Sequence, residues 1–578
     1  MSGLTLDSNF AAASQADWLE AVEKALKGKP ADTLVSEDLA GFTRRPLYTE
    51  ADSATALDEA GLPGFAPFIR GAKAINGKFL PWHIAQRVVL GRANADNAAI
   101  LTDLTGGVSA LTLDFSEKSA TAATLERLLK NVLLDIAPLS LANAKAADAR
   151  AVLALLDAGS IGDVPLFLNL SPLTAPQDAL DLAALAQARP AARLLTANGA
   201  AWHAQGASVP QELGWMLAEV IEGVRLLESN GIEAAQALSK ITLSVAADVD
   251  FFASLAKIRA ARLLFANIAD AIGATDTPPQ IHAETSLRAF SDVDPWVNIL
   301  RATTASMAAG IAGIDLMTVA PCTATGASDN SLTRRIARNT QIILQEESHI
   351  GHVADAAGGS WYVEQLTRDL AESGWAEFQK IEAAGGILAA QESGSVQAAL
   401  DKQTDAFTAA VDTRALPLVG ISEFPNIDEK PLDAGKADGG YRFAQGFEAL
   451  RRAAEKAKPR VFVACIGDMA SFTPRANFAT NLYNAGGMQA HIGDGGNDAK
   501  AIADAFKKSN AKITVICGSD TDYDAHADAV ATALQGAGAT HIALAGKPRA
   551  HDAIDAYCFA GCAALSFLQD IHEKLGLS

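Results

Sequence analysis

Cysteine is scarce in this sequence, with five residues in 578. So few scattered cysteines exclude the disulfide framework of a small secreted protein. Cys558 and Cys562 lie four positions apart in an apolar stretch that we expect to be helical, and we interpret them as buried thiols rather than a redox or metal pair. Long apolar runs are also missing, which argues against membrane spans. The opening MSGLTLDSNFAAAS has neither the basic nor the apolar segment of a secretory signal.

Positive charge is low as well. The chain has 47 Lys and Arg against 67 Asp and Glu, for a formal net charge of −20. This balance disfavours a nucleic-acid partner and suits a cytoplasmic protein. Hydrophobic residues make up 49% and charged residues 20%, a globular composition. The length predicts two or more domains.

Short apolar runs alternate with amphipathic stretches from about residue 160 onward. Predicted strands lie at 165–170, 192–197, 241–247, 278–286 and 316–322, and predicted helices include 210–231, 251–273, 295–314 and 331–348. This alternation predicts parallel βα units. Their number favours a closed (β/α)8 barrel of the TIM type, although the weaker signal between 90 and 160 hides some of the eight strands.

A stretch rich in Pro, Gly and charge at 413–440 interrupts this pattern and reads as an interdomain linker, followed by a helix at 441–457. Predicted strands then return at 461–467, 488–495, 513–519 and 541–546, with amphipathic helices between them. This second alternation predicts a doubly wound, flavodoxin-like domain. The expected domains are an arm at 1–40, the barrel at 41–412, the linker at 413–458 and the flavodoxin-like domain at 459–578.

Several long motifs carry a family resemblance. They are LPWHIAQRV (80–88), AKIRAARLLFA (256–266), RIARNTQIILQEES (335–348), AAGGSWYVEQLT (356–367) and PLVG (417–420). In this order they resemble the cobalamin-dependent acyl-CoA mutases, methylmalonyl-CoA mutase above all, from about residue 40 to the end. The resemblance implies a barrel that threads the acyl-CoA and a C-terminal domain that carries cobalamin. It also implies a radical rearrangement that begins when the carbon–cobalt bond breaks.

The cobalt-ligand motif of that family is missing. Cobalamin-binding members have Asp-x-His-x-x-Gly after the first strand of the C-terminal domain, and the His ligates cobalt while the Asp orients it. Here Met469, Ser471 and Pro474 stand at those positions, and Asp468 is one residue out of register. We therefore expect no cofactor-binding or metal-binding residue on this chain.

The substrate motifs of the barrel differ too. Lys73 and Gly77 replace two tyrosines that active members carry before the Pro-Trp motif. Active members place a His five residues before a Gly-Ala pair; here the pair is Gly206-Ala207 and that position is Ala201. His203 is displaced by two residues, beyond hydrogen-bond reach of a substrate placed as in the family, and we interpret it as a surface or loop histidine. No catalytic residue is expected.

Some enzymes of this family pair a catalytic chain with a second chain of the same fold that binds no cobalamin. The sequence resembles that second, small or beta, chain, whose expected partner is a homologous large (alpha) catalytic subunit in a heterodimer. The holoenzyme interconverts (R)-methylmalonyl-CoA and succinyl-CoA with adenosylcobalamin, expected on the partner, and the isolated chain is expected to be inactive. By resemblance, the arm with its helix at 17–28 wraps the partner. A self-sufficient cobalamin-dependent mutase and a non-catalytic acyl-CoA-binding scaffold are the alternatives.

Two further clusters have competing interpretations. A metal site could be formed by Glu346, Glu347, His349, His352 and Asp355. We favour a polar loop at the barrel rim, because the helix should end before His352. Arginines of the same helix could meet CoA phosphates, but we favour pairing with Glu346 or Glu347; they are Arg334, Arg335 and Arg338.

Two glycine-containing stretches resemble nucleotide-binding loops only loosely. GDGGNDAKA (493–501) lacks the Lys-Ser/Thr of a P-loop, so we interpret it as a turn with a helix N-cap. GAGATH (536–541) precedes a strand rather than a helix, which is wrong for a dinucleotide fingerprint.

Overall fold

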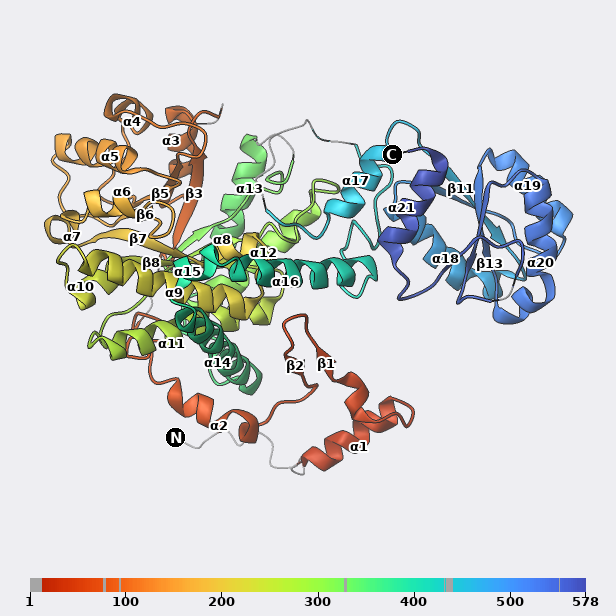
Figure 1. Ribbon diagram of the computed structural model, residues 1–578, viewed down its shortest axis with the longest axis horizontal. Coiled ribbons are helices and arrows are strands. Elements are labelled where there is room, and N and C mark those ends of the chain that lie inside the picture. The colour runs from red at the N-terminus through yellow and green to blue at the C-terminus, as the bar shows by residue number, and fades with distance from the viewer. Residues whose placement is uncertain are drawn as a thin grey trace, which may run out of the picture.

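Eight parallel strands close into a barrel in this computed structural model (Figure 1), which describes residues 13–75, 79–92, 95–326, 330–430, 432, 440–549 and 551–577. The strands are β3 (His83–Val89), β4 (Ala110–Asp114), β5 (Leu139–Ala142), β6 (Leu166–Leu170), β7 (Ala192–Asn198), β8 (Ile241–Ala247), β9 (Gln280–Thr285) and β10 (Leu316–Thr318). Strand β10 pairs with both β9 and β3, which closes the ring. The predicted TIM-type barrel is thus confirmed, and β3 to β5 supply strands that the sequence did not reveal.

Helices surround the barrel. They are α3 (Asn97–Thr105), α4 (Ala122–Leu128), α5 (Ala146–Ala158), α6 (Pro176–Asp181), α7 (Leu185–Ala188), α8 (Gly199–Ala204), α9 (Val209–Glu228), α10 (Ala234–Leu238), α11 (Phe251–Ala271), α12 (Val297–Ala312), α13 (Ser331–Ile342), η2 (Ile343–Glu347), α14 (Trp361–Ala383), α15 (Ile387–Glu392) and α16 (Ser395–Asp412). Helix α9 begins where Ser208 caps the backbone of Gln211. The apolar face predicted for it is buried in the barrel core; its residues are Leu213, Leu217, Val220, Val224 and Leu227.

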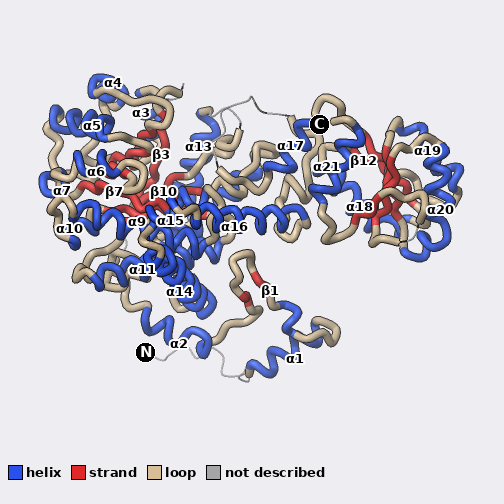
Figure 2. Tube along the Cα trace, viewed as in Figure 1, coloured by secondary structure: helices blue, strands red, loops and turns tan. Residues whose placement is uncertain are grey.

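The C-terminal part contains a five-stranded parallel sheet in the order β12-β11-β13-β14-β15. The strands are β11 (Arg460–Cys465), β12 (Gln489–Ile492), β13 (Ile513–Cys517), β14 (His541–Ala545) and β15 (Ala556–Cys558), and the helices are α17 (Gln445–Ala454), α18 (Met469–Ala485), α19 (Ala499–Ser509), α20 (Asp520–Gly536) and α21 (Ala564–Leu575). Figure 2 shows helices on both faces of this sheet. Alternate β11 residues accordingly join two separate cores: Val461 packs with α18 and α21, and Phe462 packs with α19 and α20.

Strand β15 was not among the predicted strands. Cys558 is its last residue and Cys562 lies in the following turn, so the helix expected there is wrong. Both thiols are buried and free, as predicted. The helical expectation failed because a four-residue spacing within an apolar run occurs in strands and turns as well.

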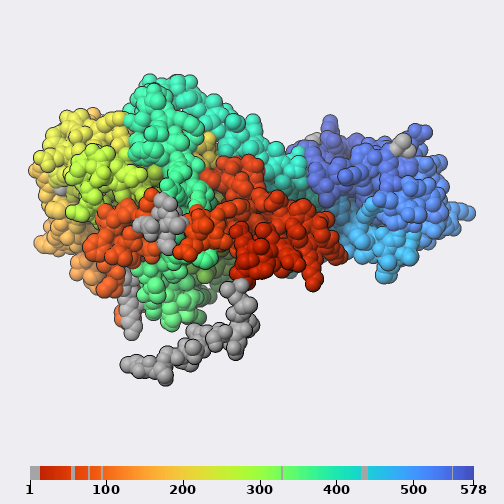
Figure 3. Space-filling model, turned by 90° about the horizontal axis from the view of Figure 1, so that it is seen from below, coloured from red at the N-terminus to blue at the C-terminus, as the bar shows by residue number. Residues whose placement is uncertain are grey.

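The N-terminal segment consists of α1 (Gln15–Ala25), η1 (Ala31–Leu34), β1 (Ser36–Glu37), β2 (Thr43–Arg44) and α2 (Glu50–Glu59). Figure 3 shows these residues, in red, lying across one side of the molecule from the barrel toward the C-terminal part. Arg44 anchors the segment, since its guanidinium lies 2.6 Å from the carboxylate of Asp250. Helix α1 buries no residue. Within the described ranges, no helix combines the length and the apolar character needed to cross a membrane.

Candidate functional site

A cavity of about 470 Å³ opens inside the barrel and at the carboxyl ends of its strands. Bulky branched side chains fill the interior of most barrels of this kind. Here the wall carries small polar side chains instead, and these leave the space open; they include Thr112, Ser140, Asn169, Thr196, Thr242, Ser244 and His282. Since TIM-barrel sites lie at this end of the strands, the cavity is the candidate site.

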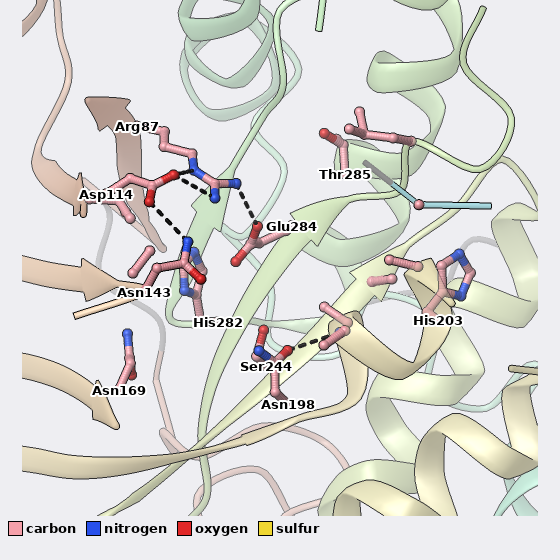
Figure 4. Close-up of a pocket in the computed structure, with 18 of the residues that line it drawn as sticks. Arg87, Asp114, Asn143, Asn169, Asn198, His203, Ser244, His282, Glu284 and Thr285 are labelled. Atoms are coloured by element: carbon pink, nitrogen blue, oxygen red, sulfur yellow. Dashed lines mark hydrogen bonds and ion pairs between the residues drawn. The ribbon is translucent and has the colours of Figure 1, made fainter. Parts of the chain in front are cut away.

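A charged cluster lies on one side of the cavity. Figure 4 shows Arg87 of β3 between Asp114 of β4 and Glu284 of β9. Its guanidinium is 2.7 Å from the Asp114 carboxylate and 3.9 Å from that of Glu284, and Asn143 donates to Asp114 at 2.9 Å. Burial alone would raise the pKa of Asp114, but Arg87 and Asn143 together hold it below its ordinary value. The cluster is therefore a satisfied ion-pair group rather than a free acid or base.

His203 lies in the opposite wall, on α8 (Figure 4). Its side chain is 3% exposed. Nδ1 is 3.1 Å from the Glu212 carboxylate, while Nε2 is 2.7 Å from the Ser286 hydroxyl and 3.2 Å from the Asp248 carboxylate. The prediction of a surface or loop histidine is thus wrong. Spacing along the chain could not show that α8 turns this side chain inward.

Glu212 links three helices beneath this wall. It is fully buried on α9, accepts from Lys257 Nζ of α11 at 2.7 Å, and contacts His203 of α8. Burial alone would raise the pKa of Glu212, but Lys257 and His203 lower it to about 2. The carboxylate is therefore ionised and structural. Sequence reasoning missed this pair, whose signal is a charged residue on the apolar face of each helix.

A short segment of the predicted linker crosses the mouth of the cavity. Tyr441 N donates to the carbonyl of Ala204 at 2.8 Å, and Phe443 N donates to the carbonyl of Arg288 at 2.9 Å. Between them, Arg442 pairs with Glu448 at 2.7 Å. We call residues 440–443 the strap; its backbone bonds to the last residue of α8 and to the loop after β9.

The positions that would carry the cobalt ligand set lie at the start of α18. Met469 is the first residue of the helix and is 75% exposed. Asp468 is the N-cap, and its carboxylate accepts from the backbone N–H of Ser471 at 2.8 Å. The Ser471 hydroxyl donates to Asp522, and Pro474 lies inside the helix. A helical turn with these side chains offers cobalt no imidazole, so the residues present do not fit a cobalamin.

The remaining substrate positions are spread out. Ala201 lines the cavity but has no polar side-chain atom. Lys73 is exposed, and its side chain is not among those that line the cavity. Gly77 lies outside the described residues. The structure therefore brings Ala201 and His203 together at the cavity and leaves Lys73 apart.

The helix expected to end before His352 does so, since η2 ends at Glu347. Asp355 instead contacts Arg259, and His349 stacks on His352 with ring centroids 4.6 Å apart. In the described part of the chain, no three His, Cys, Asp or Glu side chains are grouped to hold a metal ion.

Arg334 and Arg338 form ion pairs within the chain, the role that we favoured over contact with CoA phosphates, but the predicted partners are wrong. Both contact Asp103 of α3 rather than Glu346 or Glu347, because their side of α13 is buried against the barrel. Arg335 is exposed. The turn at 493–501 is confirmed as an N-cap: Asp498 accepts from the backbone of Lys500 and Ala501 at the start of α19.

Comparison with known proteins gives a consistent result. The profile of the methylmalonyl-CoA mutase family matches residues 37–136 and 175–504. A protein of Streptomyces virginiae named methylmalonyl-CoA mutase small subunit is 37% identical, over 100% of this chain and 99% of its own length. One of the same name from Propionibacterium freudenreichii subsp. shermanii is 32% identical, over 100% and 97%. A Cereibacter sphaeroides protein named methylmalonyl-CoA mutase is 28% identical, over 87% and 77%.

Proposed function

Because this chain belongs to the methylmalonyl-CoA mutase family, we propose that it is the small (beta) subunit of a heterodimeric methylmalonyl-CoA mutase. The holoenzyme interconverts (R)-methylmalonyl-CoA and succinyl-CoA by an adenosylcobalamin radical mechanism. In this proposal the homologous large (alpha) subunit carries the cofactor and the chemistry. This chain stabilises that subunit and has no catalytic, cofactor-binding or metal-binding residue of its own.

The start of α18 is the observation that carries the proposal. The cofactor would need an imidazole whose tautomer is fixed by a carboxylate. Ser471 stands at the ligand position and is bonded to Asp522, while Asp468 is used as a helix cap. Both polar groups are thus committed to the local fold, and neither can hold cobalt.

We further propose the domain division 1–40, 41–412, 413–458 and 459–578, with a flavodoxin-like domain of the cobalamin-binding type at the end. Numbered within the C-terminal sheet, the strand order is 2-1-3-4-5, which is the flavodoxin-like order. Helices on both faces of that sheet agree with a doubly wound domain (Figure 2). The arm is assigned to partner contact, which agrees with an α1 that buries none of its own residues.

The cavity favours a second candidate, a scaffold that binds acyl-CoA without turnover. Among the described residues, four polar atoms in its wall are buried without a hydrogen-bond partner: Thr112 Oγ1, Asn169 Oδ1, Thr242 Oγ1 and Arg288 Nε. Such atoms are normally satisfied by water or a ligand. A polar chain threaded through the barrel would satisfy them.

Coexpression with and without the large subunit tests the proposal. We expect the two chains to elute together from a size-exclusion column, with one corrinoid per heterodimer and mutase activity. The lone chain should be colourless and inactive. A lone chain that elutes as an active homodimer with bound corrinoid would instead establish a self-sufficient mutase. Calorimetry of the lone chain with an acyl-CoA ester tests the second candidate, the acyl-CoA-binding scaffold. Micromolar binding in the absence of the large subunit would favour that scaffold.

A further inference from the structure

The outward face of α12 is apolar along its length. Helix positions spaced by three and four carry the side chains Trp296, Ile299, Leu300, Thr303, Thr304, Met307 and Ile311, which we call the α12 stripe. Leu300 is 68% exposed, and Trp296 and Met307 are exposed as well. A surface helix of a globular protein normally turns such a face toward the core and charged residues toward water.

Charge is absent from the stripe for a structural reason. The single charged residue of α12, Arg301, points inward and donates to Asn298 and to the carbonyl of Val419, each at 2.7 Å. The hydroxyls of Thr303 and Thr304 bond to carbonyls of their own helix. Neither threonine hydroxyl of the stripe therefore depends on water for its hydrogen bond.

Neighbouring elements extend this apolar surface. Val419 is held beside α12 by Arg301 and is exposed. Leu332 of α13, the adjacent helix of the barrel ring (Figure 1), and Ile343, the first residue of η2, are exposed too. Neighbouring exposed apolar side chains on a surface are a mark of protein interaction sites.

We propose that the α12 stripe, with Val419, binds the large catalytic subunit, an inference that rests on the proposed function. The names of the relatives, methylmalonyl-CoA mutase small subunit, imply a large partner. A second copy is disfavoured because each copy carries a formal net charge of −20 and self-association would bring two such charges together. A stable interface needs roughly 1,000 Å² or more, with aromatic anchors near its centre. Trp296 supplies an aromatic anchor at the N-terminal end of the stripe, and the two threonines beside it can be desolvated with their hydroxyls still paired.

A matched pair of double variants tests the inference. Leu300→Glu with Met307→Glu places two charges in the stripe while keeping good helix formers. The control, Leu133→Glu with Ile136→Glu, changes two exposed apolar residues in the loop between α4 and β5; they are 62% and 68% exposed, against 68% for Leu300 and 36% for Met307. Affinity for the purified large subunit is measured by sedimentation. We expect the stripe variant to bind at least about tenfold more weakly and the control to bind like the unmodified chain.

Hydrogen exchange on the unmodified chain gives a second measurement that needs no substitution. Peptides covering residues 296–311 should be protected when the large subunit is added. Equal affinity of both double variants, or no protection, would overturn the inference while leaving the heterodimer intact. A homodimer of the lone chain that the stripe variant dissociates would assign the surface to a second copy and overturn it also. If the unmodified chain does not pair with the large subunit at all, the proposed function itself fails.

Discussion

The buried ion pair between Glu212 and Lys257 allows a quantitative prediction. Both side chains are buried, and their charged atoms are 2.7 Å apart. A pKa of about 2 for Glu212, against an ordinary 4.5, corresponds to about 3 kcal/mol of favourable interaction with its surroundings. Lys257→Met keeps most of the side-chain volume but leaves a buried carboxylate with one partner fewer. Removing one member of a buried pair costs about 3–5 kcal/mol.

We therefore expect Lys257→Met to lower the melting temperature of the barrel by roughly 5–10 °C. Scanning calorimetry measures this directly. The double variant Lys257→Met with Glu212→Gln should recover at least half of the lost melting temperature, because no uncompensated buried charge remains. Lys240→Met is the matched control: this buried lysine donates to the carbonyls of Pro190 and Ala192, so its loss should cost about 1–2 kcal/mol. A Lys257→Met protein that melts within about 1 °C of the unmodified one would refute this account of the pair.

Two more predictions concern the pH dependence of this ion pair and the start of α18. Because the pKa of Glu212 is depressed, its stabilising effect is present above about pH 4.5 and is lost as the pH falls toward 2. The difference in melting temperature between the unmodified chain and Lys257→Met should thus shrink from pH 6 to pH 3, and a difference that grows would contradict the assignment. Ser471→His should not confer cobalamin binding, because the residue lies in the first turn of α18 beside an N-cap. Titration with aquocobalamin should leave its visible spectrum unchanged, whereas a stoichiometric spectral shift would show that one imidazole suffices.

Barrel strands could be predicted from about residue 160 onward, where short apolar runs alternate with amphipathic stretches, but not before it. Strands β6 to β10 were found near their predicted positions, since buried parallel strands read as short apolar runs. Strands β3, β4 and β5 each carry a buried polar residue within the run: Gln86, Thr112 and Ser140. Thr112 and Ser140 line the cavity. Polar cavity residues alone do not explain the difference, because β6 to β9 carry them as well. The helices around β4 are short, with 9 residues in α3 and 7 in α4 against 20 in α9 and 21 in α11, which weakens the βα alternation there.

The site itself depends on contacts that the sequence does not reveal. His203 reaches Glu212 nine positions away and Ser286 eighty-three positions away. Spacing along the sequence cannot predict such contacts. They form because the barrel places α8 beside the end of β9. The motif at 467–474 could be judged from the sequence because ligand, orienting acid and glycine must occupy fixed positions within one short loop.

The cavity also predicts which part of an acyl-CoA could enter it. Each of the four arginines in its wall already has a partner: Arg87 with Asp114, Arg92 with Glu117, Arg442 with Glu448, and Arg288 with two backbone carbonyls. Apart from the Nε–H of Arg288, which has no partner, a substrate carboxylate would have to displace one of these partners, at a cost that a neutral chain avoids. The other unpartnered atoms are two neutral hydroxyls and an amide oxygen, which suit amide groups. We therefore expect calorimetry of the lone chain to detect pantetheine but not methylmalonate at millimolar concentration. If methylmalonate binds and pantetheine does not, a cation in this wall is available to a substrate carboxylate. That result would contradict the proposal that this barrel is non-catalytic.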